Sequence, residues 1–481
     1  MIPADVRGVR AGTEKTGSIM AEKTSIEKRI AEKVKAAGGN TYYVGGFVRD
    51  RLLGTDNKDV DVEVHGVTPE TLMQILEECG EPLSYGQSFG IYSLRGEDID
   101  IAMPRRERKT GAGHRDFEVD VDPFIGTYEA ARRRDFTINA LMEDVLTGEI
   151  VDHFGGQEDL AKKVIRHIDD ATFVEDPLRV LRAAQFAARF GFSVAPETIE
   201  LCRTIDLSSL SRERVTEEMK KALLKAEKPS AFFEVLREMD QLGTWFPELE
   251  DLIGIEQDPV FHPEGDVWTH TMQVVDRAAA FRDQVSEPFR FMMLALTHDM
   301  GKAVTTAFVK GRIHAYEHET QGVPIVSRFI HRLTNEHEVI SYVLNMVPLH
   351  MRPNIAAYNK TSLKSTNRMF DTAAAPGDLI YFAQADHPVV SGSEKFSGDP
   401  EFLEERLRSY LETMEQPHVT GRDLIEAGIE PGEQMGELLE YAHKLRLAGI
   451  DRDSAMKQVL AQARKSREKE SRRQKTAGKD S

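Results

Sequence analysis

The hydrophobic and polar positions of this chain follow two different periods, and the change falls near residue 150. Between Asn40 and Ile150, short runs rich in β-branched and aromatic residues are separated by helical or polar stretches; these runs are 41–48, 58–64, 89–96 and 97–103. Beyond that point, apolar residues recur every three or four positions, as in 214–226, which is the period of amphipathic helices. The pattern predicts an α+β protein, with an α/β head followed by an almost wholly helical body.

Shifts in composition divide the chain further. Pro259 and Pro263, with glycines near them, indicate a joint near 250–265, and a polar stretch indicates another near 390–400. From residue 464 onward the chain is dense in charge and lacks aromatic residues, which is typical of a tail that is disordered or forms a frayed helix. The expected segments are a flexible N-terminus (1–26), the head (27–150), a helical neck (151–250), a second helical domain (251–400), a C-terminal helical segment (401–463) and the charged tail (464–481).

Composition narrows the class of protein. Of the 481 residues, 40% are hydrophobic and 30% are charged, and no apolar run approaches the length of a membrane span. The first residues are polar and lack the apolar centre of a secretory signal. Cys79 and Cys202 have no metal-type spacing, so we expect a reducing, cytoplasmic setting and no membrane partner. The net charge of −18 argues against a nucleic-acid coat over the whole surface, but one basic cleft can still hold phosphates.

The first chemical motif is a glycine pair between a predicted strand and a predicted helix. Gly45 and Gly46 follow the run 41–44, and residues without a side chain let backbone N–H groups approach a phosphate chain. Arg49 falls in the first turn of the next helix, where its guanidinium can pair with a triphosphate oxygen. A turn without any ligand is the alternative for a Gly-Gly pair by itself.

Three acidic residues follow on predicted strands. Asp59 and Asp61 are alternate residues, so their carboxylates project from one face of a strand. Asp100 lies in the later run 97–103, where alternation turns it to the same side. Carboxylates on one strand face are the usual ligands of a Mg²⁺ pair. A solvated strand face is the alternative, and the order of the two motifs favours the catalytic interpretation.

A helix in the neck combines an acceptor with two donors. Asp176 is a good N-cap and Pro177 suits the first helical position. Arg179 and Arg182 lie three residues apart, so they share a face with Asp176. A carboxylate beside a guanidinium can bond to the Watson–Crick edge of one base. A capped helix with solvated arginines is the alternative.

The helical body carries a second set of chemical residues. His270, the adjacent pair His298-Asp299 and the distant Asp386 form an H…HD…D pattern, which resembles that of HD-type phosphohydrolases. Imidazole and carboxylate ligands on separate helices suit a transition metal with open positions for water. A single helical histidine is usually structural, and the adjacent pair favours the metal site. Further ligand or phosphate-contact candidates are His314, His318 and His350.

The motifs, taken in order, resemble the class II tRNA nucleotidyltransferase and bacterial poly(A) polymerase family over about residues 40–225. They are GGFVRD (45–50), DVD (59–61), RRDFTINA (133–140), Asp152 with Gly155-Gly156 and Asp159-Leu160, EDPLRVLR (175–182), and Glu213-Arg214-Val215 with Glu218. Gln185 departs from the pattern, because the family often has a further arginine there.

The resemblance implies a polymerase-β-like nucleotidyltransferase head, a neck that binds nucleobase and RNA, an HD domain and a C-terminal tail that grips tRNA near 419–436. It implies that Asp59 and Asp61 hold Mg²⁺, that Asp100 orients or deprotonates the RNA 3′-hydroxyl, and that a basic loop at 105–113 helps to switch from C to A. The implied nucleotide-binding residues are Gly45, Gly46, Arg49, Arg134, Asp135, Asn139, Asp176, Arg179 and Arg182.

We therefore expect addition of CCA to the 3′ end of tRNA from CTP and ATP. A poly(A) polymerase and an enzyme that adds only CC or only A remain open alternatives. A rival class is a metal-dependent phosphohydrolase acting at the HD site with Ni²⁺, Co²⁺, Mn²⁺ or Mg²⁺, as a main or second activity. A non-catalytic RNA-binding protein would lack the carboxylates that this chain retains. The sequence does not indicate the oligomeric state.

Overall fold

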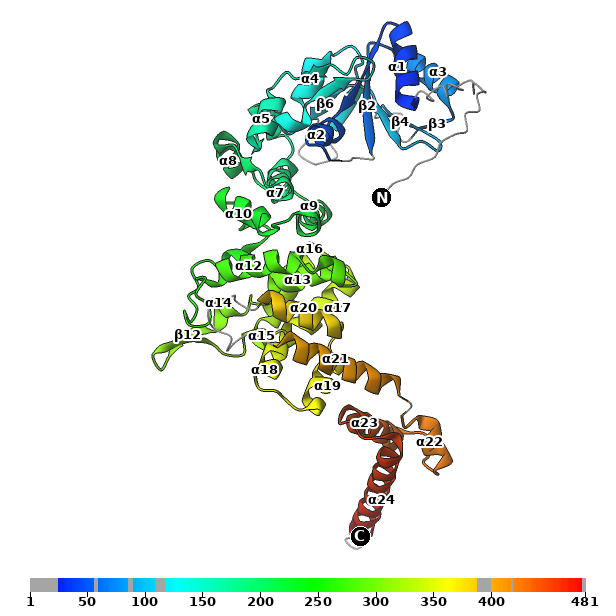
Figure 1. Ribbon diagram of the computed structural model, residues 1–481, viewed down its shortest axis with the longest axis vertical. Helices are drawn as coiled ribbons and strands as arrows, with labels where there is room; N and C mark the ends of the chain where they lie inside the picture. The colour runs from blue at the N-terminus through cyan, green and yellow to red at the C-terminus, as the bar shows by residue number, and fades with distance from the viewer. Residues whose placement is uncertain are drawn as a thin grey trace, which may run out of the picture. The chain divides into compact units, whose positions relative to one another are not determined.

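The computed structural model describes residues 25–55, 59–84, 90–109, 117–386, 399–416 and 418–477. The chain forms two compact units, Met1–Leu160 and Ala161–Ser481. The first unit contains a sheet and the second is mainly helical, which confirms the predicted α+β class (Figure 1). None of the described helices is both long and apolar enough to cross a membrane.

The described part of the first unit contains a seven-stranded sheet in the order β3-β4-β5-β2-β1-β8-β9. β2 and β5 run parallel, and the other neighbouring strands are antiparallel. Alternate side chains of β2, among them Val62 and Val64, are buried in the core, as the period of a strand requires. The strands are β1 (Asn40–Val44), β2 (Val60–His65), β3 (Pro82–Ser84), β4 (Ile91–Leu94), β5 (Ile99–Ala102), β8 (Met142–Asp144) and β9 (Ile150–Val151).

Helices cover and extend this sheet. α1 (Ile26–Ala36) packs on α3 (Pro69–Cys79) and on β1, and Ile30, Val34 and Leu72 are buried there. The other elements of the unit are α2 (Gly46–Leu52), β6 (Arg105–Lys109), β7 (Phe117–Val121), α4 (Thr127–Arg132), the 3₁₀ helix η2 (Thr137–Asn139) and α5 (Gly156–Lys162).

One segment of the head differs from the prediction. Residues 105–109, expected to be part of a basic loop, form β6, which pairs antiparallel with β7. The run RRERK has no alternation of apolar and polar residues, so its period gives no strand signal. The remainder of the expected loop, 110–116, lies outside the described residues.

The second unit begins with the neck. α7 (Leu178–Phe190) packs against both α9 (Arg212–Lys225) and α10 (Ser230–Glu238). Val180, Leu181 and Val215 are fully buried between these helices. The smaller neck elements are β10 (Val164–Ile165), α6 (Asp170–Phe173), β11 (Ser193–Val194), α8 (Pro196–Arg203) and α11 (Pro247–Glu250). The expected joint near 250–265 corresponds to the non-helical residues between α11 and α12.

A helical domain follows, with its core around the apolar helix α13. α12 packs on α13 and α20, and α13 also contacts α17, as Figure 1 shows in green and yellow. The elements are α12 (Val267–Ala279), η3 (Arg282–Gln284), α13 (Pro288–Thr297), α14 (Lys302–Thr305), β12 (Thr306–Val309), β13 (Arg312–Ala315), α15 (His318–Gln321), α16 (Val323–Leu333), α17 (His337–Met346), η4 (Val347–Leu349), α18 (Arg352–Tyr358), α19 (Leu363–Thr372) and α20 (Pro376–Asp386).

The C-terminal helices are α21 (Pro400–Glu415), α22 (Gly421–Glu426), α23 (Glu433–Leu447) and α24 (Arg452–Ala477). Leu424, Leu438 and Val459 contribute to a small apolar core among the last three helices. α24 continues to Ala477, so the tail from residue 464, expected to be either disordered or a frayed helix, is helical as far as the structure describes it. Alanine, glutamate, lysine and arginine favour helices, and in this tail they outweigh the lack of apolar residues.

Candidate functional site

Three acidic residues meet at neighbouring strands of the head. Asp59 immediately precedes β2, Asp61 lies on it, and Asp100 on β5 stands directly opposite Asp61 in the parallel register. Burial raises the pKa of Asp61; the carboxylates of Asp100 and Asp59 raise it further, and Arg134 opposes them. Because mutual repulsion of this kind is relieved by a cation, the donor set suits a hard divalent metal ion.

The glycine turn between β1 and α2 brings an arginine against the backbone. Gly45 has φ +64°, and a Cβ atom at that position would lie 2.8 Å from Nη1 of Arg134. Only a residue without a side chain combines this backbone with such a close approach. The turn therefore places Arg134 beside the start of α2 and within electrostatic reach of Asp61.

Arg49 is buried and held on two sides. Its Nε donates to Oδ1 of Asp50 at 2.8 Å, and its Nη1 donates to Oδ1 of Asn139 at 2.6 Å. Asn139 in turn donates from Nδ2 to Oδ1 of Asp135 at 2.9 Å. The structure therefore shows Asp135 and Asn139 positioning Arg49, while their direct contact with a nucleotide stays a prediction. The sequence analysis assigned Asp50 no role, although its motif includes that residue.

Glu63 is a buried acid that the sequence analysis missed. Its Oε2 lies 3.4 Å from Nη2 of Arg134, and its Oε1 accepts from Nε2 of His65 at 2.8 Å. Burial alone would raise the pKa of Glu63, but His65 and Arg134 hold it below its usual value. The signal was present, because Glu63 continues the alternation of Asp59 and Asp61 along β2.

The charged residues at the start of the neck helix α7 form hydrogen bonds with other protein groups. Asp176 accepts from the backbone N–H of Leu178 at 3.1 Å, so it caps the helix. Its two carboxylate oxygens lie 3.1 and 2.9 Å from Nη2 of Arg214, on α9. Arg179 donates to the carbonyl of Thr172 at 2.6 Å. The structure thus shows Arg214, which sequence reasoning placed only within a motif, as the partner that orients Asp176.

Arg182 lies one turn further along α7. Its guanidinium stacks over the ring of Phe186, 5.0 Å from the ring centroid, in the arrangement of a cation–π contact. Gln185, the departure from the family pattern, is buried.

The helical domain brings the four predicted metal ligands together. Nε2 of His270 lies 3.1 Å from Oδ1 of Asp386 and 3.4 Å from Nε2 of His298. Nε2 of His298 lies 3.2 Å from Oδ2 of Asp299. These atoms come from α12, from the residues that follow α13, and from the end of α20. Helices distant in sequence therefore converge on one point.

Two of the three optional histidines join this cluster. Nε2 of His318 lies 3.2 Å from Oδ1 of Asp299 and 3.3 Å from Nε2 of His350. His314, the third, instead lies on β13 and stacks against Tyr316 at 4.8 Å between ring centroids. Asp299 therefore stands between two pairs of histidines, which is a donor set for two neighbouring cations.

Hydrogen bonds at Nδ1 fix the orientation of three imidazole rings whose Nε2 atoms lie in the cluster. Nδ1 of His298, His318 and His350 donates to the carbonyls of Ala295, Ala315 and Val347 at 2.9, 2.8 and 2.7 Å. Because a carbonyl oxygen only accepts, Nδ1 must carry a proton, so Nε2 is the nitrogen directed at the cluster, and it offers a lone pair there whenever the imidazole is neutral. This is the outer-shell arrangement of metal-binding histidines.

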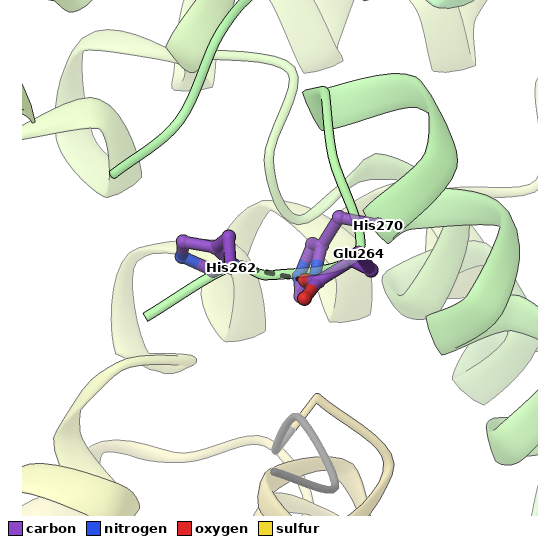
Figure 2. A group of neighbouring side chains, drawn as sticks. All are labelled: His262, Glu264 and His270. Carbon is purple, nitrogen blue, oxygen red and sulfur yellow. Dashed lines mark hydrogen bonds and ion pairs between the residues drawn. The ribbon is translucent and has the colours of Figure 1, made fainter. Parts of the chain in front are cut away.

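Glu264 fixes the fourth imidazole. Its Oε1 accepts from Nδ1 of His270 at 2.7 Å and from Nδ1 of His262 at 3.0 Å. Figure 2 shows His262 and His270 with Glu264 between them. Burial would raise the pKa of Glu264, but the two histidines lower it far below its usual value. The charge of Glu264 therefore orients one ligand of the cluster and one histidine beside it.

The charges of the cluster also suit a cation. Burial disfavours the ionised forms of Asp299 and Asp386, yet neighbouring histidines hold the pKa of both well below its usual value. Burial likewise disfavours a charge on His298, but these two carboxylates raise its pKa to about 10. The two carboxylates therefore favour a positive charge at this position, which a metal ion bound at Nε2 would supply.

A cavity of about 560 Å³ lies beside the cluster. Its lining includes His318 and Asp386 of the cluster, together with His262 and Lys302. Lys302 Nζ is 2.7 Å from Oδ2 of Asp299. The lining also includes the aromatic rings of Phe261, His314 and Tyr316. A volume of this size is typical of small-molecule sites.

Three family models match the chain in succession. The Poly A polymerase head domain matches residues 41–166, the probable RNA- and SrmB-binding site of polymerase A matches residues 191–253, and the HD domain matches residues 267–387. Together they span both the carboxylate group of the head and the histidine cluster of the helical domain.

Similar proteins extend over most of the chain. The Multifunctional CCA protein of Nitrosococcus oceani is 37% identical over 405 residues, which cover 83% of this chain and 95% of the relative. That of Paraburkholderia phymatum is 38% identical over 385 residues, covering 77% and 89%.

Solved structures show the same fold. The CCA-adding enzyme of Bacillus stearothermophilus in complex with CTP has a TM-score of 0.64 and 22% identity, and the match covers 92% of this chain and 97% of that one. The Thermotoga maritima CCA-adding enzyme complexed with tRNA has a TM-score of 0.59 and 21% identity, with coverage of 90% and 94%.

Proposed function

The chain belongs to the family of CCA-adding tRNA nucleotidyltransferases and bacterial poly(A) polymerases, and from this premise we propose that it adds CCA to the 3′ end of tRNA from CTP and ATP. The observation that carries the proposal is the group formed by Asp59, Asp61 and Asp100 beside the arginine-lined turn at Gly45. Relatives that cover most of the chain are Multifunctional CCA proteins. We place the reaction in the cytoplasm, where its substrates occur.

Nucleotidyltransferase heads depend on metal ions in general. The residues of this head fit Mg²⁺, since the carboxylates of Asp61 and Asp100 repel each other and are oxygen ligands. We propose that Asp59 and Asp61 hold the ion, which would supply positive charge to the triphosphate when bound. Asp100 orients the RNA 3′-hydroxyl and accepts its proton.

The chemical step then forms one bond and breaks one. The 3′-oxygen of the RNA attacks the α-phosphorus of the nucleotide, and the bond to pyrophosphate breaks. Arg49 and Arg134 lie beside the glycine turn, where their charges stabilise the leaving pyrophosphate. Asp50 and Asn139 keep Arg49 in place, so less side-chain entropy is lost when the nucleotide binds.

Selection between C and A falls to the neck. Asp176 and Arg179 present an acceptor and a donor fork, which together can meet a Watson–Crick edge. Arg214 orients the carboxylate of Asp176, and Arg182 lies one turn away on the same helix. No nucleic-acid template is required, because protein side chains take its place.

The test uses three tRNAs, ending before CC, after CC or after CCA. Each is incubated with purified protein, Mg²⁺ and both CTP and ATP, one of the two nucleotides being labelled, and the ends are sequenced. Completion of CCA on the first two, with none on the third, supports the proposal. Long runs of A indicate a poly(A) polymerase, and C-only or A-only products indicate a partial enzyme. No incorporation on any tRNA contradicts nucleotidyl transfer.

We further propose a phosphohydrolase activity at the HD cluster. The observation in its favour is that four histidines keep Nε2 directed at Asp299 and Asp386 through hydrogen bonds at Nδ1. A bound Ni²⁺, Co²⁺, Mn²⁺ or Mg²⁺ would lower the pKa of a coordinated water. The neighbouring cavity accommodates a nucleotide-sized phosphate ester. Hydrolysis of 2′,3′-cyclic nucleotides, assayed with each metal separately, tests this proposal.

A further inference from the structure

A second cavity, of about 460 Å³, lies at helices α18 and α19 of the helical domain. No residue that lines it belongs to the carboxylate group, the base-reading helix or the histidine cluster. Three of its lining residues are cationic, Arg352 on α18 and Lys364 and Arg368 on α19, and none is acidic. The chain as a whole carries a net charge of −18, so a cavity whose charged lining residues are all cationic requires an explanation.

These three cations lack acidic partners. Within the part of the chain that the structure describes, Arg352, Lys364 and Arg368 form no ion pair. Other cations of the helical domain behave differently, because Lys360 pairs with Asp399 and Arg290 pairs with Glu338. The groove therefore presents positive charge that the protein leaves available to a ligand.

The arrangement is unfavourable without an anion. Lys364 and Arg368 are four residues apart on α19, so they share a face, and like charges at that spacing destabilise a helix. Arg352 adds a third positive charge from the neighbouring helix. On α23, by contrast, the same spacing carries opposite charges, in Lys444 and Glu440. A bound polyanion would convert this repulsion into attraction.

Hydroxyl groups line the cavity as well, beside the apolar side chains of Ile355, Ala356 and Met369. Thr361, Ser362 and Ser365 face the same cavity. Oγ1 of Thr361 is buried and has no hydrogen-bond partner among the described residues. Hydroxyls beside unpaired cations are the donors that proteins direct at phosphate oxygens of a nucleic-acid backbone.

We propose that this groove between α18 and α19 binds the sugar-phosphate backbone of the tRNA substrate. The inference rests on the proposed tRNA-directed function and adds a binding surface to it. It concerns affinity for RNA and not the chemical step, because no lining residue belongs to either catalytic group. Backbone contacts of this kind hold an RNA in place without reading its sequence.

The test replaces two cations while retaining the volume of their stems, in the double variant Lys364→Gln with Arg368→Gln. We expect the KM for tRNA lacking CCA to rise roughly 5- to 50-fold at 100 mM salt, with kcat and the KM for CTP unchanged. The slope of log affinity against log salt should become shallower by about one to two units, since each lost phosphate contact removes close to one. Binding of fluorescent tRNA, measured by anisotropy without CTP, gives the affinity independently of turnover.

Stability separates a binding role from a structural one. Because the replacement removes repulsion between like charges, the thermal midpoint of the free protein should stay the same or rise. The matched control is Lys33→Gln with Arg95→Gln, which removes two cations already paired with Glu78 and Glu81 and should leave tRNA affinity unchanged.

Two results would overturn the inference. One is an unchanged affinity and salt slope for tRNA in the Lys364/Arg368 variant, which would leave the groove to a partner other than RNA. The other is an equal loss of tRNA affinity in the control, which would reduce the effect to overall charge. A wild-type protein that binds tRNA through this groove but adds no nucleotide would contradict the proposed function and not the groove.

Discussion

At the scale of single residues, the acidic group of the head shows why position on a strand decides chemistry. Asp61 and Asp100 face each other across two parallel strands, and burial together with that proximity raises the pKa of Asp61. Between two exposed aspartates water would screen this repulsion, and a cation would stabilise the pair much less. Alternation along the strand was enough to predict the shared face, whereas the register between strands came only with the fold.

The first prediction concerns these carboxylates. Asp59→Ala or Asp61→Ala should abolish incorporation while the protein remains folded, because each removes a proposed ligand of Mg²⁺. A metal ion supplies several kcal/mol of transition-state stabilisation, which corresponds to a loss of roughly a thousandfold or more in rate. The loss of rate is measured as incorporation of labelled CTP at saturating Mg²⁺, and circular dichroism is the control for folding. Turnover near that of the wild type in either variant would remove the residue from the site.

The second prediction concerns choice of base. Asp176→Ala or Arg179→Ala should relax selection among CTP, ATP, UTP and GTP more than it weakens triphosphate binding, by about 1–3 kcal/mol of discrimination per lost bidentate contact. Competition assays with all four nucleotides give the discrimination, and the KM for CTP gives the binding.

Arg214→Lys provides a graded comparison for base choice. It keeps the charge beside Asp176 but loses the guanidinium plane, so its selectivity should fall between those of the wild type and Asp176→Ala. An intact nucleotide preference in both Asp176→Ala and Arg179→Ala would mean that another element reads the base.

At the scale of elements, strands and helices with regular periods were predictable and irregular contacts were not. β2, β5 and α7 follow from alternation or from 3.6-residue spacing together with a cap. β6 escaped prediction because RRERK is charged at every position. The bond between Asp176 and Arg214 joins residues 38 positions apart, and neither local pattern nor composition specifies such a pairing.

The third prediction tests the turn between β1 and α2. Gly45→Ala should retain the fold but lose activity, because a side chain on a backbone with φ 64° and ψ −131° costs about 1–3 kcal/mol and its Cβ would displace Arg134. Thermal unfolding should show the modest loss of stability, and the KM for CTP should rise. Gly54→Ala is the matched control, since Gly54 also has a positive φ but a Cβ there meets nothing within 4 Å. Equal activity in the two variants would show that backbone strain alone, without Arg134, explains any defect.

At the scale of the whole molecule, two separate chemical centres occupy one chain. The carboxylate group lies in the first compact unit, and the histidine cluster lies in the second. The sequence predicted that His270, His298, Asp299 and Asp386 come together, because an adjacent His-Asp pair is distinctive, and their binding of a metal stays a prediction. His318 and His350 stayed optional, since a lone helical histidine is usually structural; only the fold brings them beside Asp299. The role of Glu264 likewise needed the fold, because a carboxylate six residues before His270 has no fixed relation to its Nδ1.

The fourth prediction follows from this separation. His298→Ala with Asp299→Ala should remove any metal-stimulated hydrolysis of 2′,3′-cyclic nucleotides, because it deletes two ligands that Asp386 and His270 cannot replace. Addition of CCA to tRNA should persist, since none of the atoms proposed for nucleotidyl transfer belongs to the cluster. Asp59→Ala should give the reverse result and leave hydrolysis intact. Both assays are run on both variants, with Ni²⁺, Co²⁺, Mn²⁺ and Mg²⁺ in turn. Absence of hydrolysis in the wild type with all four metals would make the HD domain a support for RNA, and complete loss of addition in a folded His298/Asp299 variant would show that the two centres depend on each other.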